Sequence, residues 1–366
     1  GKFGFVKTAG FHGSAPQICC FSNRQSHAKE QAMRACCSQF SLYSGQNKQC
    51  SGQMHENLPQ LAAYCAPASA YCGPRRTLAG SLLTVLLPAL VIGALSAGFY
   101  WVLIPWLEGR QMGSGYVLLF RATSIVTEAM QGQSPRGVLM VLTVVLVTLP
   151  SLWLVLNKLH HRPLRSVFGP SLRLNWRDVA IGAVVVLGAA LLRPSLYTDG
   201  LPSLAIPPGA WLIWLPIALP ILFAQCLTEE MFFRGYLQQQ LAARFASRWA
   251  WLVLPSVLFS LIHYNSGAPA LLNWMNIAAL AIMGAMAADV TARTGNLGAA
   301  VGLHFGNNLY LVLLHTQYNT MNGLALMQSP PPSTLGGLIL APIEHVLPLL
   351  FAYMIYRNLT APRAHA

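Results

Sequence analysis

Two adjacent carboxylates in an otherwise apolar stretch, Glu229 and Glu230, are the residues best suited to chemistry. The chain contains only ten Asp and Glu residues, and a charge inside a membrane is costly, so this pair indicates a functional site. On a helix, Arg234 shares a face with Glu230, four residues earlier, and the two are expected to pair. Glu229 points roughly 100° away from that face, which leaves its carboxylate free for other work.

Two further motifs place polar side chains on single helix faces. Phe259 lies four residues before His263, and His304 lies four residues before Asn308. At a rise of about 1.5 Å per residue, these groups and Glu229 fall at similar depths in the inner and middle part of a bilayer. We therefore expect one cavity to be lined by Glu229, His263, His304 and Asn308. Taken singly, each motif also fits a structural role, because polar side chains hold membrane helices together.

The elements that carry these motifs must be membrane helices. Hydrophobic residues make up 54% of the 366-residue chain and charged residues 9%, against about 25% charged in soluble domains. This composition excludes a soluble enzyme and a disordered chain, and it predicts an all-α polytopic membrane helix bundle. Apolar segments of about 20 residues predict about eight transmembrane helices, at approximately 77–107, 137–156, 177–193, 217–237, 249–264, 270–290, 297–315 and 336–356.

The net charge of +13 fits the loops of a membrane protein and does not indicate nucleic acid as a partner. With the N-terminus inside, the inner loops hold most of the basic residues: Arg75, Arg76, Lys158, Arg162, Arg165, Arg173, Arg177, Arg244, Arg248, Arg293, Arg357 and Arg363. The outer loops hold Arg110, Arg121, Arg136 and Arg193. The positive-inside rule therefore predicts that both termini are cytoplasmic.

Residues 1–76 differ from the rest of the chain because they hold seven of the eight cysteines and no long apolar run. The cysteines show no CxxC spacing, which disfavours a disulfide or metal module. We expect this segment to be a disordered tail or a translated upstream extension, with Met54 as a suitable start. Residues 77–357 then form the membrane domain, with the motifs in a core at 215–315, and residues 358–366 form a short cytoplasmic tail.

Together, the three motifs resemble those of the CPBP family (CAAX protease and bacteriocin-processing, also called Abi), a family of intramembrane proteases. That family carries Glu-Glu-x-x-x-Arg, Phe-x-x-x-His and His-x-x-x-Asn on successive helices, and the spacing here is the same. The resemblance implies a CAAX-prenyl-protease-like endopeptidase, whose partners are the lipid bilayer and a peptide or protein substrate. It implies that Glu229, helped by His263, activates water, and that the oxyanion hole is formed by His304 and Asn308. Supporting roles fall to Glu230, Arg234 and Phe259.

The family has often been described as metal-dependent, and Glu229, His263 and His304 would make a zinc-type ligand set. Because the chain has no His-Glu-x-x-His motif, we expect a mechanism that requires no cofactor, with zinc as the alternative. The expected location is the bacterial inner membrane, and the oligomeric state stays open. Two other classes of function also stay open: a non-catalytic membrane protein such as a bacteriocin-immunity factor, and a proton-coupled transporter.

Overall fold

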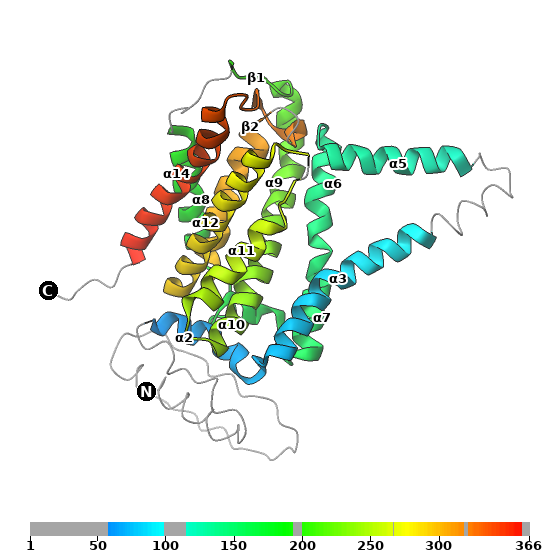
Figure 1. Cartoon of the computed structure of the whole chain (residues 1–366). Helices are drawn as coiled ribbons and strands as arrows, with labels where there is room; N and C mark the ends of the chain where they lie inside the picture. Colours follow the sequence, from blue (N-terminus) through cyan, green and yellow to red (C-terminus); the bar gives the residue numbers. More distant parts are fainter. Residues whose placement is uncertain (1–57, 99–114, 193–199, 266, 318–320, 361–366) are drawn as a thin grey trace, which may run out of the picture. The chain divides into compact units, whose positions relative to one another are not determined.

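Helices form most of the regular structure in the computed structural model, which describes residues 58–98, 115–192, 200–265, 267–317 and 321–360 (Figure 1). The α-helices are α2 (Pro59–Cys65), α3 (Pro74–Gly98), α5 (Gly115–Gln131), α6 (Pro135–Leu146), α7 (Thr148–Leu154), α8 (Trp176–Leu192), α9 (Pro208–Glu230), α10 (Gln239–Arg244), α11 (Leu254–Leu261), α12 (Ala270–Thr294), α13 (Gly298–Asn308) and α14 (Leu335–Thr360). Short 3₁₀-helices are η2 (Ala66–Tyr71), η5 (Leu164–Phe168) and η9 (Asn322–Leu324). π-Helical turns are η4 (Val155–Leu159), η6 (Met231–Gln238), η7 (Trp249–Val253) and η8 (Leu309–Leu314).

Four stretches of the described residues are long and apolar enough to cross a membrane: Pro135–Leu159, Pro208–Arg244, Ala270–Thr294 and Leu335–Asn358. The shorter apolar helices are Trp249–Leu261 and Gly298–Leu314. Each of these six overlaps a predicted span, while α3 and α8 overlap the remaining two. The predicted all-α bundle of membrane helices is confirmed, and the count of eight spans stays a prediction. The end of the first predicted span, 99–107, lies outside the described residues.

The folded part of the chain begins before the predicted boundary at residue 76. Within the segment expected to be a tail, α2 and η2 are helical, and Leu61, Tyr64 and Ala68 are fully buried in the main hydrophobic core. Their spacing matches one face of a helix, so this short segment buries an apolar stripe although it is too short to span a membrane. Residues 58–76 therefore belong to the folded unit, which corrects that part of the expectation. The rest of the predicted tail, 1–57, lies outside the described residues.

The helix that carries the two carboxylates is longer than the predicted span 217–237. It runs through α9, η6 and α10 from Pro208 to Arg244, and its π-helical part, η6, begins directly after Glu230. Nearly every side chain between Thr228 and Ala243 is buried. This part of the helix is thus surrounded by protein, which is where a membrane protein can hold polar groups.

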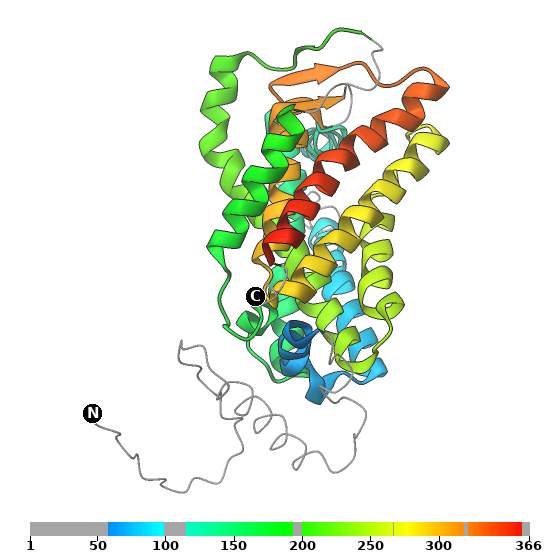
Figure 2. The same ribbon diagram turned by 90° about the vertical axis from the view of Figure 1, so that its left-hand side faces the viewer.

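Three glycines hold α13 directly against the backbone of α8. Gly298, Gly302 and Gly306 recur every four residues, and a Cβ added at each would overlap a backbone carbonyl oxygen of the segment that contains α8. Such small residues let two helix backbones approach closely, and this spacing is common between membrane helices. We call this contact the glycine seam. It presses one face of α13 onto α8, and the same helix packs against α9, α12 and α14 (Figure 2).

A small sheet ties loops together at the end of the bundle where α9 begins (Figure 1). Its strands are β1 (Ser203–Leu204), β2 (His315–Gln317) and β3 (Met327–Ser329). β3 lies in the middle, antiparallel to β1 and parallel to β2, with Ser203 opposite Gln328 and His315 opposite Met327. The strands join the segment before α9 to those after η8 without changing the all-α character of the bundle.

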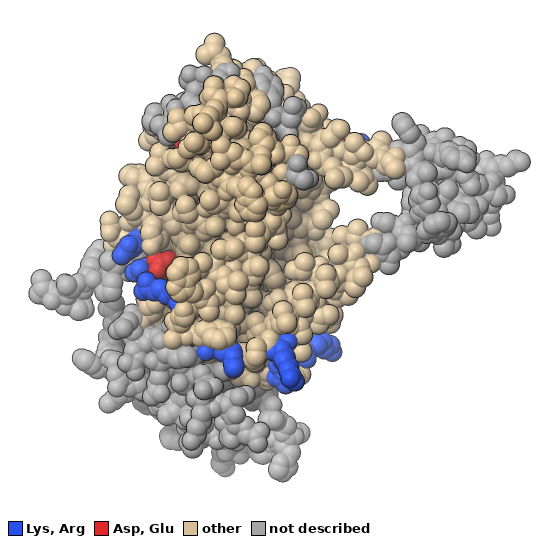
Figure 3. All heavy atoms as spheres, viewed as in Figure 1, with Lys and Arg blue, Asp and Glu red and all other residues tan. Residues whose placement is uncertain are grey.

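The charged residues of the bundle are distributed unevenly over its surface. In the space-filling view, most of the Lys and Arg side chains lie toward the end where α2 and α10 are found (Figure 3). The surface above them is nearly free of charge in that view, and large apolar side chains such as Leu82 and Leu90 of α3 are exposed. A broad uncharged band above a basic edge is the surface that a lipid bilayer and its inner headgroups require.

Candidate active site

The predicted ion pair between Glu230 and Arg234 is present. Arg234 Nη1 donates to Glu230 Oε1 at 2.9 Å, and both residues are 0% exposed. The pair lies at the junction of α9 and η6, four residues apart on one continuous helix. Because a buried charge is stable only with a close partner, the two residues hold each other in the ionised form.

His304 of α13 contacts both carboxylates. Its Nδ1 lies 2.9 Å from Glu230 Oε1, and its Nε2 lies 3.7 Å from Glu229 Oε2. An ionised carboxylate only accepts hydrogen bonds, so the proton of the imidazole belongs on Nδ1. Glu230 therefore fixes the orientation of His304 and aims its other nitrogen at Glu229. The sequence motifs predicted that His304 and Glu229 would meet, but they did not reveal the bond to Glu230.

Phe259 of α11 lies at the centre of the site and is fully buried. Its ring centroid is 5.7 Å from that of His304 and 5.0 Å from that of His263, and the Arg234 Cζ lies 4.6 Å above it. A guanidinium over an aromatic face is attracted by the ring quadrupole. Phe259 thus packs all three motifs together, and Phe233 closes the cluster from η6 with an edge-to-face contact at 5.2 Å.

His263 lies in the turn that follows α11, because the helix ends at Leu261 instead of reaching the predicted residue 264. The side chain is exposed, and its Nδ1 lies 2.8 Å from the Phe259 carbonyl oxygen, to which it donates. The Nε2 atom of the neutral ring is then an acceptor. Within the described residues, His263 makes no hydrogen bond to Glu229 and joins the site through the Phe259 ring.

Asn308, the last residue of α13, contacts α9 one turn before the carboxylates. Its Nδ2 lies 3.4 Å from both Gln225 Oε1 and Cys226 Sγ, two long hydrogen bonds. Both partners are buried, and neither was predicted from the sequence to be part of the site. Their positions four residues before Glu229 and Glu230 are the feature that could have marked them, since those spacings share helix faces. The structure therefore places Asn308 beside the carboxylates without a direct bond to them.

Two carboxylate oxygens of the site, Glu229 Oε2 and Glu230 Oε2, have no hydrogen-bond partner among the described residues. Glu229 is 8% exposed, and its Oε2 accepts no hydrogen bond from any described residue. Such a buried oxygen is strongly disfavoured unless something donates to it, and a polar separation of 3.7 Å is suited to a bridging water. The Oε2 atom therefore faces His304 as an available proton acceptor.

The three side chains of the alternative zinc-type ligand set all belong to this site. His304 Nε2 lies 3.7 Å from Glu229 Oε2, whereas His263 meets the site through the Phe259 ring. Among the described residues, no three His, Cys, Asp or Glu side chains are grouped so that they could hold a metal ion. Zinc stays the alternative to the mechanism without a cofactor.

Comparison with known proteins finds a family model that matches the part of the chain around this site. Residues 210–310 match the family model described as Rce1-like, type II CAAX prenyl endopeptidase, and this range contains all three motifs. The resemblance predicted from the sequence is thereby confirmed. The match supports peptidase activity and an integral membrane location at the level of the family.

One curated relative is similar over the same part of the chain. An uncharacterized protein of Bacillus subtilis (strain 168), YyaK, is 26% identical over 187 residues, which cover 49% of this chain and 61% of the relative. The chain thus spans less than two thirds of the length of that relative. No solved structure matches the chain.

Proposed function

We propose that this membrane protein, whose residues 210–310 match the Rce1-like family, is an intramembrane endopeptidase in which Glu229 activates the attacking water. The observation that carries this proposal is the buried Glu229 Oε2, which lacks a hydrogen-bond donor among the described residues and faces His304 Nε2 at 3.7 Å. A water that donates to this oxygen would lie beside the imidazole. Loss of its proton to Glu229 would make it a nucleophile toward a peptide carbonyl carbon. Glu229 would then return this proton to the amine nitrogen as the C–N bond of the tetrahedral intermediate breaks.

His263 would assist Glu229 as a second proton acceptor. The Phe259 carbonyl holds the proton of the imidazole on Nδ1, so Nε2 is available to accept. Since His263 lies in an exposed turn, it would act at the side of the site that is open to solvent and substrate. The Phe259 ring sets its distance from His304.

His304 and Asn308 would stabilise the negative oxygen of the tetrahedral intermediate. His304 can donate from Nε2 when both ring nitrogens carry protons, and Glu230 on Nδ1 holds the ring in the orientation that this donation requires. Asn308 would supply a second N–H from Nδ2, because its present bonds to Gln225 and Cys226 are long and easily exchanged. One oxyanion donor is typically worth about 10²–10³ in kcat.

Arg234 and Phe259 would hold the other side chains of the site in position. Arg234 keeps Glu230 ionised, and Glu230 in turn orients His304. Phe259 fills the space between the three motifs and keeps water away from the ion pair. A dry, prearranged site strengthens each electrostatic contact that forms during the reaction.

We propose a mechanism without a metal ion, in which Glu229 Oε2 and His263 Nε2 accept protons and do not bind zinc. We further propose that the protein lies in the bacterial inner membrane with both termini in the cytoplasm, as the distribution of basic residues predicts. The family match favours a peptidase over the alternatives of an immunity factor and a proton-coupled transporter.

The test is cleavage by the purified full chain in proteoliposomes, with a library of membrane peptides that includes prenylated CAAX peptides. Glu229→Gln keeps the shape of the side chain but cannot take a proton from water, so cleavage should fall by about 10²–10⁴-fold. The matched control is Glu128→Gln, which alters a carboxylate outside the site and should cleave like the wild type. Cleavage by Glu229→Gln at the wild-type rate would disprove the role of Glu229. Unchanged activity in the presence of a chelator is the result expected for a metal-free site.

A further inference from the structure

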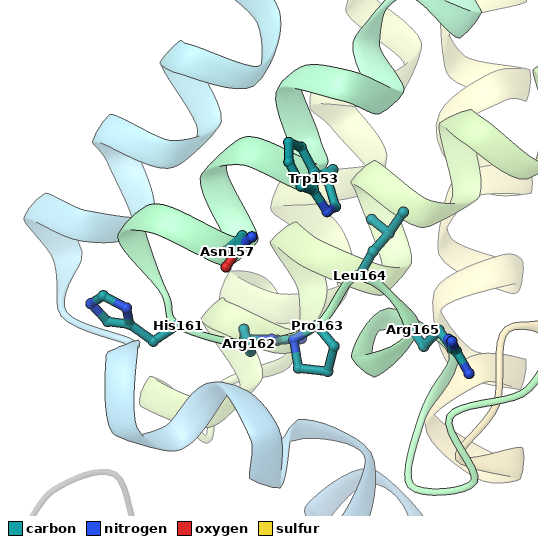
Figure 4. Close-up of a pocket in the computed structure, with 7 residues that line it drawn as sticks. All are labelled: Trp153, Asn157, His161, Arg162, Pro163, Leu164 and Arg165. Atoms are coloured by element: carbon teal, nitrogen blue, oxygen red, sulfur yellow. The ribbon is translucent and has the colours of Figure 1, made fainter. Parts of the chain in front are cut away.

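A pocket of about 580 Å³ lies outside the proposed active site, where the helix Pro135–Leu159 ends. Trp153 and Asn157 line it from the helix, and the loop that follows supplies His161, Leu164 and Arg165 (Figure 4). In the figure, Trp153 and Leu164 face each other across the pocket, with His161 and Arg165 toward its two ends. One wall is therefore apolar, while the ends carry groups that donate hydrogen bonds or positive charge.

Behind this pocket lies a positive charge that no described carboxylate neutralises. Arg162 also lines the pocket, yet its side chain is buried, with the residue 5% exposed. Its Nε donates to Ser166 Oγ at 2.8 Å and its Nη2 to Gln239, both neutral, while Nη1 has no hydrogen-bond partner among the described residues. Burial lowers the pKa of Arg162 to about 10, so the guanidinium stays charged at neutral pH.

The side chains that line the pocket and its position in the fold both favour an anionic ligand. Lys158, Arg162 and Arg165 add positive charge, and the residues that line the pocket include no Asp or Glu. A buried guanidinium without a counter-ion projects its field into the adjacent pocket. The pocket lies where a candidate span ends, between its last turns and the loop that follows, at the depth of the inner headgroups.

We propose that this pocket binds the phosphate headgroup of an anionic phospholipid. A lipid is favoured over free phosphate for two reasons. First, the pocket is much larger than a phosphate ion and has the volume typical of a site for an organic ligand. Second, the half-exposed indole of Trp153 suits the border between the acyl chains and the headgroups of a bilayer. Basic pockets at the cytoplasmic ends of membrane helices bind anionic headgroups in general. The proposal stands independently of the proposed protease activity.

Hydrogen bonds also connect the loop that forms this pocket to the helix that carries Glu229 and Glu230. Arg162 bonds to Gln239, and His160 bonds to Tyr236 at 2.9 Å and to Gln240 at 3.1 Å. These partners belong to η6 and α10, which continue the helix that carries Glu229 and Glu230. A lipid in the pocket would therefore rest against the loop that packs on the catalytic helix.

The experiment measures which lipids the purified full chain retains in detergent, by native mass spectrometry. The probes are phosphatidylglycerol and phosphatidylcholine with identical acyl chains, and inorganic phosphate serves as a competitor. We expect selective retention of phosphatidylglycerol, and a loss of about fivefold in its apparent affinity in Arg165→Gln, as for one interfacial charge. The matched control, Arg173→Gln, changes an exposed basic residue of the same loop that does not line the pocket, and should retain the lipid like the wild type.

Three results would overturn the proposal. Equal retention of the two lipids would show that charge is not recognised. Equal losses in Arg165→Gln and Arg173→Gln would show general surface attraction instead of a site. Release of the lipid by millimolar inorganic phosphate would make the pocket a site for free phosphate.

Discussion

Replacement of Glu230 by Gln tests whether the buried ion pair is structural, catalytic or both. Gln keeps an oxygen that can accept from Arg234 and from His304, so the substitution removes the charge and leaves the hydrogen bonds available. Arg234 is then a guanidinium at 1% side-chain exposure with no anion beside it. Removal of one partner from a buried pair costs about 3–5 kcal/mol, a large part of a total stability of about 5–15 kcal/mol.

A double-mutant cycle separates the two roles. Arg234→Met leaves Glu230 as an unpaired buried anion and should be similarly destabilising. The double variant Glu230→Gln/Arg234→Met has no buried charge from this pair, so it should be more stable than the sum of the single effects predicts, by about 2 kcal/mol or more. Its activity should not return, because the negative charge beside His304 Nδ1 is still absent. We expect cleavage to stay reduced by up to about 10²-fold.

The assay is equilibrium unfolding of the purified variants in mixed detergent micelles, followed by circular dichroism, with peptide cleavage measured on the same preparations. Glu128→Gln breaks an exposed pair with Arg136 and should change stability little. The stabilising role of the buried ion pair is refuted if Glu230→Gln unfolds like the wild type, or if the effects of the two single variants on the free energy of unfolding simply add. Full activity in the double variant would refute a role in catalysis for the negative charge of Glu230.

Three further predictions concern the parts of the fold that hold the site. Gly302→Val should destabilise the protein and reduce cleavage together, because the side chain would force α13 away from α8, and thermal unfolding with cleavage assays would detect both. Removal of residues 1–53 should leave cleavage unchanged, whereas removal through residue 73 should destabilise the bundle. The longer deletion removes the buried Tyr64, whose hydroxyl lies 2.9 Å from the Val167 carbonyl oxygen and 3.2 Å from that of Arg234. Burial, with the positive charges of Arg162 and Arg76, lowers the pKa of His160 to about 4, so the free energy of unfolding should fall as the pH drops from about 6.5 to about 4. His160→Gln should flatten that pH dependence, and equal pH profiles for the two proteins would contradict the assignment.

The parts of the site that are set by local geometry could be predicted from the sequence. Glu230 and Arg234 are four residues apart on a helix, and this spacing alone brings them together. The bond from His304 to Glu230 joins residues 74 apart in the chain, so it depends on how α13 packs against α9 and on no local pattern. Asn308 illustrates the same limit, because its partners on α9 are defined only by the packing of the two helices.

The differences in the fold also have local physical causes. The end of α11 before His263 follows from Asn265, Gly267 and Pro269, which favour turns and stop a helix. The apolar run up to residue 264 concealed this end. The sequence did not predict α2, because its apolar stripe is too short to be recognised as a membrane span. The π-helical turn η6 has no signature in the 3.6-residue periodicity that the prediction used.

The glycine seam has a consequence for the temperature range in which the site keeps its geometry. Lipid chains are as apolar as helix side chains, so the hydrophobic effect adds little to the contact between α8 and α13 within a bilayer. The contact is held instead by dispersion between two closely spaced backbones. Hydrophobic stabilisation weakens on cooling, whereas this dispersion does not share that dependence. The seam should therefore keep His304 and Asn308 in place at low temperature. Assemblies that are held together by the hydrophobic effect should loosen under the same conditions.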